Sequence, residues 1–402
     1  MAQPERLGDH VEVVTGFPFR SDEYSESGTR LLRGDNIGQG KLRWVGAKRW
    51  PEERVAESAR FALNAGDVVL AMDRPWIEAG LKYAAVTEHD LPSLLVQRVA
   101  RLRAKGDLVQ PFLRYLIGSR SFTDYILGVQ TGTGIPHISV GQIRDYRFAW
   151  VPVDEQRAIA EVLGALDDKI VLNERIAETS LVLAQSLYDR CASDSLDWRE
   201  WKLKDAATWS SGGTPKTGEP SYWNGDIPWI SAASLKTPWL AESARSVTPL
   251  GVQNGTRLAP KGAILFVVRG MSLTSEFRIG VAQRELAFGQ DCKALIPHPS
   301  VDSTALFFAI RSHSPKILEM VDLAGHGTGR LVTDRIANLV VRLPQGESIR
   351  QFTDGIGSLA RAASSAIEEN RTLTDLRDTL LPQLVTGKLR VKDATRVVEE
   401  AV

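Results

Sequence analysis

The sequence predicts an α+β protein with two similar globular domains of mixed α/β structure. Two long helices join the domains and are expected to pair as an antiparallel coiled coil. Three observations predict this architecture. The chain contains an internal repeat with an offset of about 195 residues, the sign of its charge alternates along the sequence, and two long stretches show a heptad pattern of apolar residues.

Short motifs recur in both halves of the chain in the same order. Leu7-Gly8-Asp9 corresponds to Leu203-Lys204-Asp205, and Gln97 corresponds to Gln290. The series continues with the pairs 63–66 and 259–262, 132–134 and 327–329, 151–152 and 343–344, and 163–166 and 356–359. An ordered series of this kind predicts a pseudo-twofold internal repeat.

Charge and local pattern divide the chain into four segments. Residues 1–150 and 195–343 are mildly basic and contain short strand-like runs broken by Gly and Pro, which is typical of globular domains. Residues 151–194 and 344–402 are net acidic and are predicted to be the two long helices, the second followed by a C-terminal tail. Each globular domain is also expected to have a helix near its end, around 110–126 and 303–322.

Both long segments place apolar residues at alternating spacings of three and four, which predicts one helical seam each. The first seam is expected at Ile159, Val162, Leu166, Lys169, Asn173, Ile176, Ser180, Leu183 and Leu187. The second is expected at Phe352, Ile356, Leu359, Ala363, Ala366, Asn370, Leu373, Arg377 and Leu380. The Asn in each seam is interpreted as a buried polar layer that fixes register, with a partner contact as the alternative.

Several classes of protein are not expected. No apolar run is long enough for a transmembrane helix, and the N-terminus lacks the pattern of a signal peptide, so a cytoplasmic location is expected. Two cysteines exclude a four-cysteine zinc site, and no phosphate-binding loop, zinc-protease or nucleophile-elbow motif occurs. Cys292 is interpreted as a core residue rather than a nucleophile. Catalysis by this chain is therefore not expected.

Two loops contain small, polar and basic residues that can approach a phosphate or a base edge closely. They are Gly16–Ser21 and Ser210–Thr217, and the alternative is that they are plain surface turns. Tryptophan is frequent early in the second half, where packing is favoured over stacking on bases.

Six short stretches together resemble a known family. They are Gly16–Ser21 with Leu31–Ile37, Ser211–Pro215 with Ile227–Ser231, Val151–Arg157, and Leu380–Val391. Taken together, they resemble the DNA-specificity subunits of type I restriction-modification enzymes over nearly the whole chain. Residues 343–347 depart from the family's Pro-x-x-Glu-Gln form, which leaves the start of the second long helix open.

The resemblance implies that each globular domain is a target-recognition domain that reads one half of a bipartite DNA site. Because the recognition loops of the two domains differ, the site is expected to be asymmetric. The coiled coil would set the spacing of the two halves and recruit methylation subunits, expected to be two. Those partners would carry S-adenosylmethionine and methylate adenine, and a restriction subunit using ATP and Mg would complete a nuclease. This chain is then a non-catalytic subunit that binds double-stranded DNA, no cofactor and no membrane.

The expected DNA contacts combine side chains of the loops and of the strand ends in both domains. They are Arg20, Arg33, Asn36, Arg74, Gln97, Arg98, Thr133, His137, Thr214, Lys216, Tyr222, Arg269, Gln290, Thr328 and Arg330. Two alternatives stay open at this point: a stand-alone DNA-cleaving enzyme with an unrecognised site, and a coiled-coil scaffold without DNA specificity.

Overall fold

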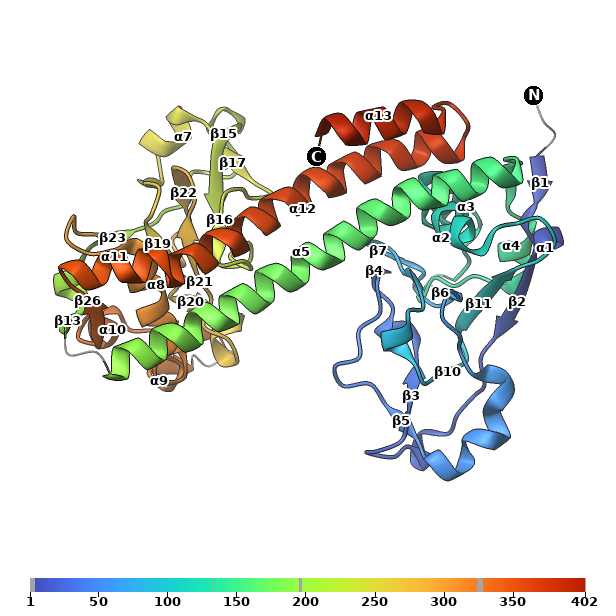
Figure 1. Cartoon of the computed structure of the whole chain (residues 1–402), viewed down its shortest axis with the longest axis horizontal. Coiled ribbons are helices and arrows are strands. Elements are labelled where there is room, and N and C mark those ends of the chain that lie inside the picture. The colour runs from blue at the N-terminus through green and yellow to red at the C-terminus, as the bar shows by residue number, and fades with distance from the viewer. Residues whose placement is uncertain (1–3, 133, 195–196, 324–327, 402) are drawn as a thin grey trace. The chain divides into compact units, whose positions relative to one another are not determined.

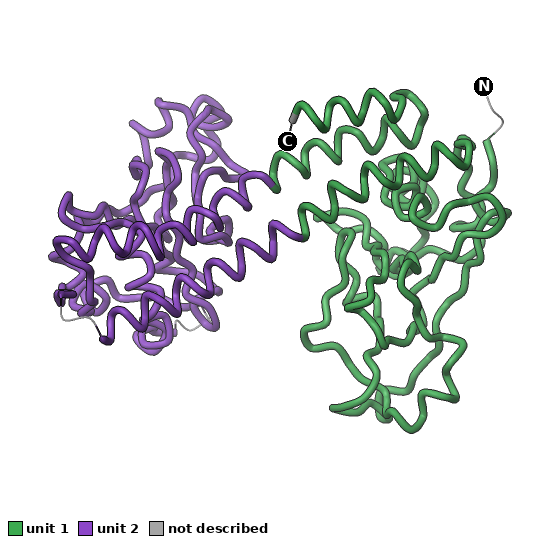
Figure 2. Tube along the Cα trace, in the orientation of Figure 1, with its two compact units in different colours: residues 1–171, 370–402 green, residues 172–369 purple. Residues whose placement is uncertain are grey.

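The structure is a computed structural model that describes residues 4–132, 134–194, 197–323 and 328–401. The chain forms two compact units (Figure 2). Unit 1 comprises residues 1–171 and 370–402, and unit 2 comprises residues 172–369. Each unit therefore combines one globular domain with part of both long helices.

Unit 1 is built on a five-stranded sheet. Its strands lie in the order β2 (Val11–Thr15), β11 (Val99–Ala104), β6 (Val68–Ala71), β9 (Tyr83–Ala85) and β4 (Gln39–Gly40). A three-stranded sheet has the order β10 (Ser93–Leu95), β3 (Thr29–Leu32) and β5 (Arg49–Trp50). Two further sheets are strand pairs. They are β1 (Pro4–Arg6) with β12 (Arg147–Ala149), and β7 (Trp76–Ile77) with β8 (Gly80–Leu81). The α-helices of this globular part are α1 (Leu7–His10), α2 (Gln110–Gly118), α3 (Arg120–Val129) and α4 (Val140–Asp145).

Unit 2 repeats this plan. Its five-stranded sheet has the order β14 (Ala207–Ser211), β23 (Cys292–Pro297), β19 (Ile264–Val267), β21 (Ile279–Ala282) and β16 (Trp239–Leu240). A four-stranded sheet has the order β17 (Ser246–Val247), β15 (Trp223–Ile230), β22 (Leu286–Phe288) and β18 (Arg257–Ala259). A three-stranded sheet has the order β20 (Arg269–Gly270), β25 (Gly329–Leu331) and β24 (Val321–Leu323). A strand pair joins β13 (Trp198–Lys202) to β26 (Val340–Pro344). Its shorter α-helices are α6 (Leu203–Ala206), α7 (Pro249–Gln253), α8 (Ser303–Ser312), α9 (Ser314–Glu319) and α10 (Thr333–Ala337).

The two units confirm the internal repeat at the level of strand pairing. One outer pair of each five-stranded sheet is parallel, β4 with β9 and β16 with β21, while the other neighbours are antiparallel. A second parallel pair also recurs, since Leu31 lies opposite Leu94 and Trp229 lies opposite Ala287. Corresponding strands fall at the offsets that the sequence motifs predict.

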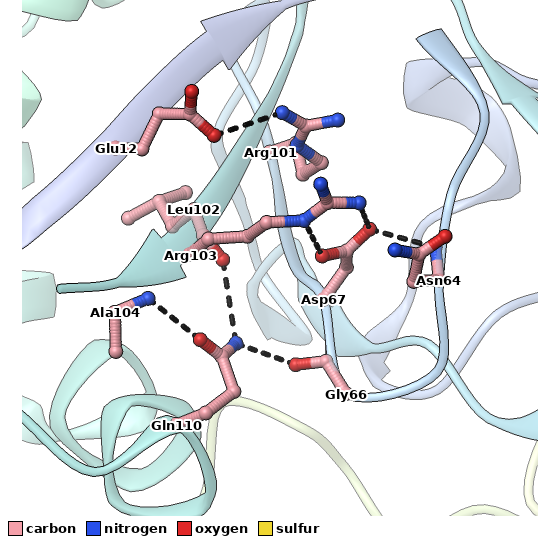
Figure 3. Close-up of polar contacts among 9 residues, drawn as sticks. All are labelled: Glu12, Asn64, Gly66, Asp67, Arg101, Leu102, Arg103, Ala104 and Gln110. Atoms are coloured by element: carbon pink, nitrogen blue, oxygen red, sulfur yellow. Dashed lines mark hydrogen bonds and ion pairs between the residues drawn. The ribbon is translucent and has the colours of Figure 1, made fainter. Parts of the chain in front are cut away.

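The start of one helix is tied to a sheet turn in the same way in both units. In unit 1 the amide of Gln110, at the start of α2, donates to the carbonyl oxygen of Gly66 and accepts from the backbone N–H of Ala104 (Figure 3). In unit 2 the hydroxyl of Ser303, at the start of α8, donates to the carbonyl oxygen of Gly262. Both glycines have φ near +85°, a left-handed conformation that suits glycine. The repeat thus preserves a contact even where the residue type changes.

The predicted helices need three adjustments. The helix expected at 303–322 is two helices, α8 and α9, with His313 between them. The helix expected at 110–126 is two helices, because Ser119 ends α2 and caps the first turn of α3, accepting from the backbone N–H of Phe122. The first long helix is α5 (Val153–Asp194), as predicted. The second is divided at Gly355 into α11 (Glu347–Asp354) and α12 (Ile356–Val385).

The C-terminal tail contains a helix that the sequence analysis did not predict. This helix, α13 (Val391–Ala401), lies back along α12 within unit 1 (Figure 1). Ala394 is fully buried, and Val391 and Val398 pack against the core of unit 1. The stretch Leu380–Val391, which resembles the family, therefore packs into the core of unit 1.

The prediction for the seam of α5 is half wrong. Ile159, Leu166 and Asn173 are buried as expected, but Ile176 and Leu183 are 38% and 45% exposed. The second row of the seam lies one residue later and consists of Leu163, Ile170, Ala177 and Ala184. The pattern gave weight to large aliphatic residues, whereas the helices of unit 2 meet through alanines, including Ala360, Ala363 and Ala366 of α12. The seam predicted for the second long helix is confirmed, since Phe352, Ala363, Leu373 and Leu380 are all buried.

The seam asparagines form polar contacts within the helix pair. In unit 2 the Asn173 amide donates to the Glu369 carboxylate at 2.8 Å. In unit 1 the Asn370 amide donates to the carbonyl oxygen of Ile170 at 3.0 Å. These contacts support the interpretation of a buried polar layer, because a shift of either helix would break them.

Candidate nucleic-acid interface

The candidate interface of each unit lies where three chain segments meet at the end of the five-stranded sheet. In unit 1 the backbone N–H of Met72 donates to the carbonyl oxygen of Arg98, and the N–H of Ile138 donates to that of Met72, both at 2.9 Å. In unit 2 the same two bonds join Val268 to Asp291 and Leu331 to Val268, at 2.8 and 2.9 Å. The two sites therefore share one backbone frame that carries different side chains.

The unit 2 site brings together three of the predicted residues. Arg269 on β20 and Arg330 on β25 lie directly opposite each other in an antiparallel pair, and Gln290 precedes β23. All three are exposed and line a cavity of about 460 Å³. Within the described residues, no side-chain hydrogen bond or ion pair joins any of the three to a neighbour. Their donors are therefore available to an external ligand.

The unit 1 site has the corresponding positions but a different charge pattern. Asp73 and His137 take the places of Arg269 and Arg330 and form an isolated β-bridge. The guanidinium of Arg98 lies 3.7 Å from the carboxylate of Asp73, and Gln97 beside it is exposed. The unit 1 site therefore presents the carboxylate of Asp73, the guanidinium of Arg98 and the imidazole of His137. The unit 2 site presents two arginines.

Backbone strain marks the unit 1 site. Arg74 and Arg98 have φ of +45° and +66°, and both are predicted site residues. Side chains other than glycine rarely adopt this left-handed conformation, which costs about 1–3 kcal/mol and is concentrated at functional sites. In unit 2 the position of Arg74 is taken by Gly270. Strain at two exposed arginines therefore points to a use of their side chains.

The remaining predicted residues of unit 1 are spread more widely. Arg20 is exposed and pairs with Asp22 at 2.8 Å. Arg33 lies on the loop after β3, near Asp35. Asn36 is only 7% exposed, and its amide accepts from the backbone N–H of Arg33 and donates to the carbonyl oxygen of Arg43. The structure thus gives Asn36 a capping role in place of the predicted base contact. Thr133 lies outside the described residues.

The predicted loop of unit 2 is held by tryptophans. The indole N–H of Trp223 donates to the carbonyl oxygen of Lys216, and that of Trp229 donates to Gly213, both at 3.1 Å. Both rings are less than a tenth exposed, which agrees with the packing interpretation. Lys216 is exposed, whereas Thr214 and Tyr222 are half-buried in the same region. Thr328 is half-buried and lies 3.9 Å from the sulfur of Met271.

Two features of the described residues bear on metal binding and on the reactivity of Cys292. No group of three or more His, Cys, Asp or Glu in the described ranges is placed to hold a metal ion. Cys292 is fully buried, and burial raises the pKa of its thiol to about 12, with a smaller contribution from Asp291. A thiol of this kind is not a nucleophile at neutral pH. No helix in the described part of the chain combines the length and apolar character that a membrane span requires.

A family model described as "type I restriction modification DNA specificity domain" matches residues 4–179 and 195–359. The chain belongs to this family. The two matched stretches begin close to the two halves of the internal repeat, so each unit of this specificity protein contains most of one domain.

Individual relatives agree with this assignment. The specificity subunit of the type I restriction enzyme EcoAI from Escherichia coli is 32% identical over 189 residues, which is 46% of this chain and 32% of that protein. The MjaVIII specificity subunit from Methanocaldococcus jannaschii is 30% identical over 174 residues, 43% of this chain and 41% of that protein. The matches thus span less than half the length of these relatives. A crystal structure of a type I S subunit from M. genitalium covers 95% of both chains with a TM-score of 0.61 and 16% identity, which shows a shared fold.

The sequence analysis missed two charged residues at the sites of this family member. Lys82 lies near Asp35, Arg74 and Asp73 in unit 1, and burial lowers the pKa of its ammonium group. Lys293 lines the unit 2 cavity and donates to the hydroxyl of Ser211 at 2.8 Å. Neither residue falls in a Gly/Pro loop, which was the signal used. The repeat gave no signal for them either, because it relates Lys82 to Arg278 and Lys293 to Ala100.

Proposed function

We propose that this chain is the non-catalytic DNA-specificity subunit of a type I restriction-modification complex, in which each unit reads one half of an asymmetric bipartite site. The observation that carries the proposal is the pair of equivalent sites at Gln97 and Gln290. Their backbone frame is the same, yet their exposed side chains differ. Two related domains that recognise different DNA sequences are expected to share a backbone structure and to differ in their hydrogen-bond donors and acceptors.

The unit 2 site fits a half-site that contains guanine. An arginine presents two parallel donors to O6 and N7 of guanine in the major groove, and a glutamine matches N6 and N7 of adenine. Arg269 and Arg330 stand side by side on two antiparallel strands, and a two-stranded ribbon fits the major groove. Gln290 supplies the adenine contact.

The unit 1 site fits a different set of base edges. Gln97 offers the same adenine contact, while the Asp73 carboxylate can accept from N4 of cytosine. Arg98 and Arg74 then serve guanine or phosphate. Two further arginines of this unit are already engaged inside the protein: Arg101 with Glu12 at 3.0 Å, and Arg103 with Asp67 (Figure 3). Arg101 and Arg103 are therefore not expected to contact DNA, in contrast to Arg74 and Arg98 at the site.

Partner subunits are expected on the helices. Leu172, Ile176 and Leu183 of α5 lie on one face of the helix and are 38–52% exposed. An apolar stripe of this kind is typical of helix docking. We assign it to methylation subunits, two per complex, which carry S-adenosylmethionine, with a restriction subunit supplying ATP- and Mg-dependent cleavage. The chain itself supplies recognition and spacing and binds no cofactor.

Methylome sequencing of the host with and without this gene tests the proposal. A split, asymmetric adenine-methylation motif should disappear with the gene. Loss of a continuous or perfectly palindromic motif would contradict two different half-sites. Purified chain that cuts DNA without partners, given a divalent metal, would instead support a nuclease.

A further inference from the structure

Unit 2 contains a second cavity that is separate from the recognition site. It has a volume of about 340 Å³ and lies between the globular part and α12. Its lining residues include Trp239, Lys261, Val281, Ala360, Arg361 and Ser364. None of them belongs to the predicted DNA contacts.

The floor of this cavity is apolar and its rim is basic. Trp239, Val281 and Ala360 are each at most 7% exposed and form the buried part of the lining. Lys261 and Arg361 are exposed at the rim, and no acidic residue of the described chain is among those that line the cavity. The described residues also provide no ion-pair partner for either cation. The charge of the lining is therefore uncompensated.

One residue of the lining, Trp239, has a buried hydrogen-bond donor without an acceptor. The indole N–H of Trp239 is buried and has no acceptor in the described structure, although the ring itself packs against Phe307 with centroids 5.6 Å apart. A buried donor without an acceptor costs about 1–3 kcal/mol. Ser365 and Thr304 add hydroxyls to the same lining. A negatively charged group at the rim can accept hydrogen bonds from both cations, while an apolar group covers the Trp239 floor.

The corresponding positions of unit 1 do not repeat this chemistry. Ala65 stands where unit 2 has Lys261, Asp168 where it has Arg361, and Val171 where it has Ser364. The basic rim is therefore a property of unit 2 alone, and the shared fold does not require it.

From these observations we propose that the cavity between α12 and the sheet of unit 2 binds a small organic anion. Its carboxylate or phosphate lies between Lys261 and Arg361, and its apolar body lies on the Trp239 floor. The anionic group belongs either to a free small molecule or to an acidic side chain of a partner subunit. This inference does not depend on the DNA-reading proposal, because every residue involved lies outside the recognition sites.

Phenyl phosphate is a suitable probe because it combines an apolar ring with a dianion. The full-length chain labelled with 5-fluorotryptophan should show a saturable shift of one fluorine resonance, which Trp239→Phe identifies by removing it. Inorganic phosphate, which lacks the ring, and benzyl alcohol, which lacks the charge, should each bind more weakly. The Lys261→Gln/Arg361→Gln variant should lose at least about tenfold in affinity, because both charge-assisted contacts are removed.

A matched control changes two other exposed cations of unit 2, Lys204→Gln/Arg350→Gln, and should keep the affinity. Absence of a saturable shift in the folded chain, or equal loss in the control variant, would overturn the site. Competition separates the two sources of the anion. If phenyl phosphate weakens the association with methylation subunits, a partner side chain occupies the cavity; if association is unchanged, the ligand is a free molecule.

Discussion

In each unit, four side chains connect the globular part to the long helices, and this set is called the joint. The joint is charged and polar in unit 1 and apolar in unit 2. In unit 1 the joint consists of Arg114 and Tyr115 on α2, Asp167 on α5 and Arg377 on α12. Asp167 is 7% exposed and accepts from Arg114 at 2.7 Å, Tyr115 at 2.8 Å and Arg377 at 2.9 Å. Burial raises the pKa of the Tyr115 hydroxyl, and Asp167 raises it further against the opposing effect of Arg114, so the phenol stays a donor.

In unit 2 the same four positions are apolar. Phe307, Phe308, Ala360 and Ala184 replace Arg114, Tyr115, Asp167 and Arg377, and each is at most 3% exposed. Because the two units share the same backbone fold, either an ionic or an apolar set of side chains can connect the globular part to the helices. The difference shows that the repeat conserves positions and spacing, while each joint is stabilised by its own set of side chains.

The largest expected effect comes from Asp167→Ala. Two guanidinium groups, each about 30% exposed, would lose their shared carboxylate. Removing one partner of a buried ionic cluster costs about 3–5 kcal/mol, and the partial exposure places this joint near 3 kcal/mol. Hydrogen exchange should rise in α2 and in the α5 segment of unit 1. Asp168→Ala, next to it but exposed, is the control and should change little. If the backbone amides of α2 and α5 exchange equally slowly in Asp167→Ala and Asp168→Ala, the ionic joint does not stabilise unit 1.

A smaller effect is expected from Arg98→Gly. Glycine adopts φ of +66° without strain, so the free energy of unfolding should rise by about 1 kcal/mol. Affinity for the DNA target should fall by roughly tenfold if the side chain contacts a base or phosphate. Thermal unfolding and a DNA titration of the assembled complex check the two changes. A stabilised variant with normal affinity would mean that the strain at Arg98 has no role in recognition.

The smallest net effect is expected when the unit 1 joint is converted to that of unit 2. The variant Arg114→Phe/Tyr115→Phe/Asp167→Ala/Arg377→Ala removes the whole Asp167 cluster at once; Asp378, which pairs with Arg377 at 2.8 Å, loses that partner but is 59% exposed. Apolar replacement of a complete ionic cluster is typically neutral or stabilising by about 1–4 kcal/mol. Hydrogen exchange in α2 should therefore stay near or below the wild-type rate. A loss as large as that of Asp167→Ala would show that the two joints are not interchangeable.

The sequence alone was sufficient for the repeat, the long helices and the equivalence of Gln97 and Gln290, because spacing and order survive when residue types change. It was not sufficient for the second row of the α5 seam. Ala177 and Ala184 are small because the helices approach closely, and only tertiary packing distinguishes them from the larger Ile176 and Leu183 outside. It also could not show that Asn36 is used as a cap, since an amide in a loop suits a base equally well.

The sheet topology was equally beyond sequence reasoning. Parallel pairs such as β10 with β3 join strands that are far apart in the chain. Their pairing depends on which apolar faces meet, and short strands of three or four residues carry too weak a pattern to reveal it.

The central claim is that each unit reads its own half of the DNA site. Methylome sequencing of hosts that carry Arg269→Ala/Arg330→Ala or Gln97→Ala/Arg98→Ala tests it most directly. Loss of a good base contact costs about 1–3 kcal/mol of discrimination. The first variant should relax or lose base preference in one half of the split motif and leave the other half unchanged, and the second variant should do the reverse. Relaxation of the same half by both variants, or an unchanged motif in both, would contradict the account.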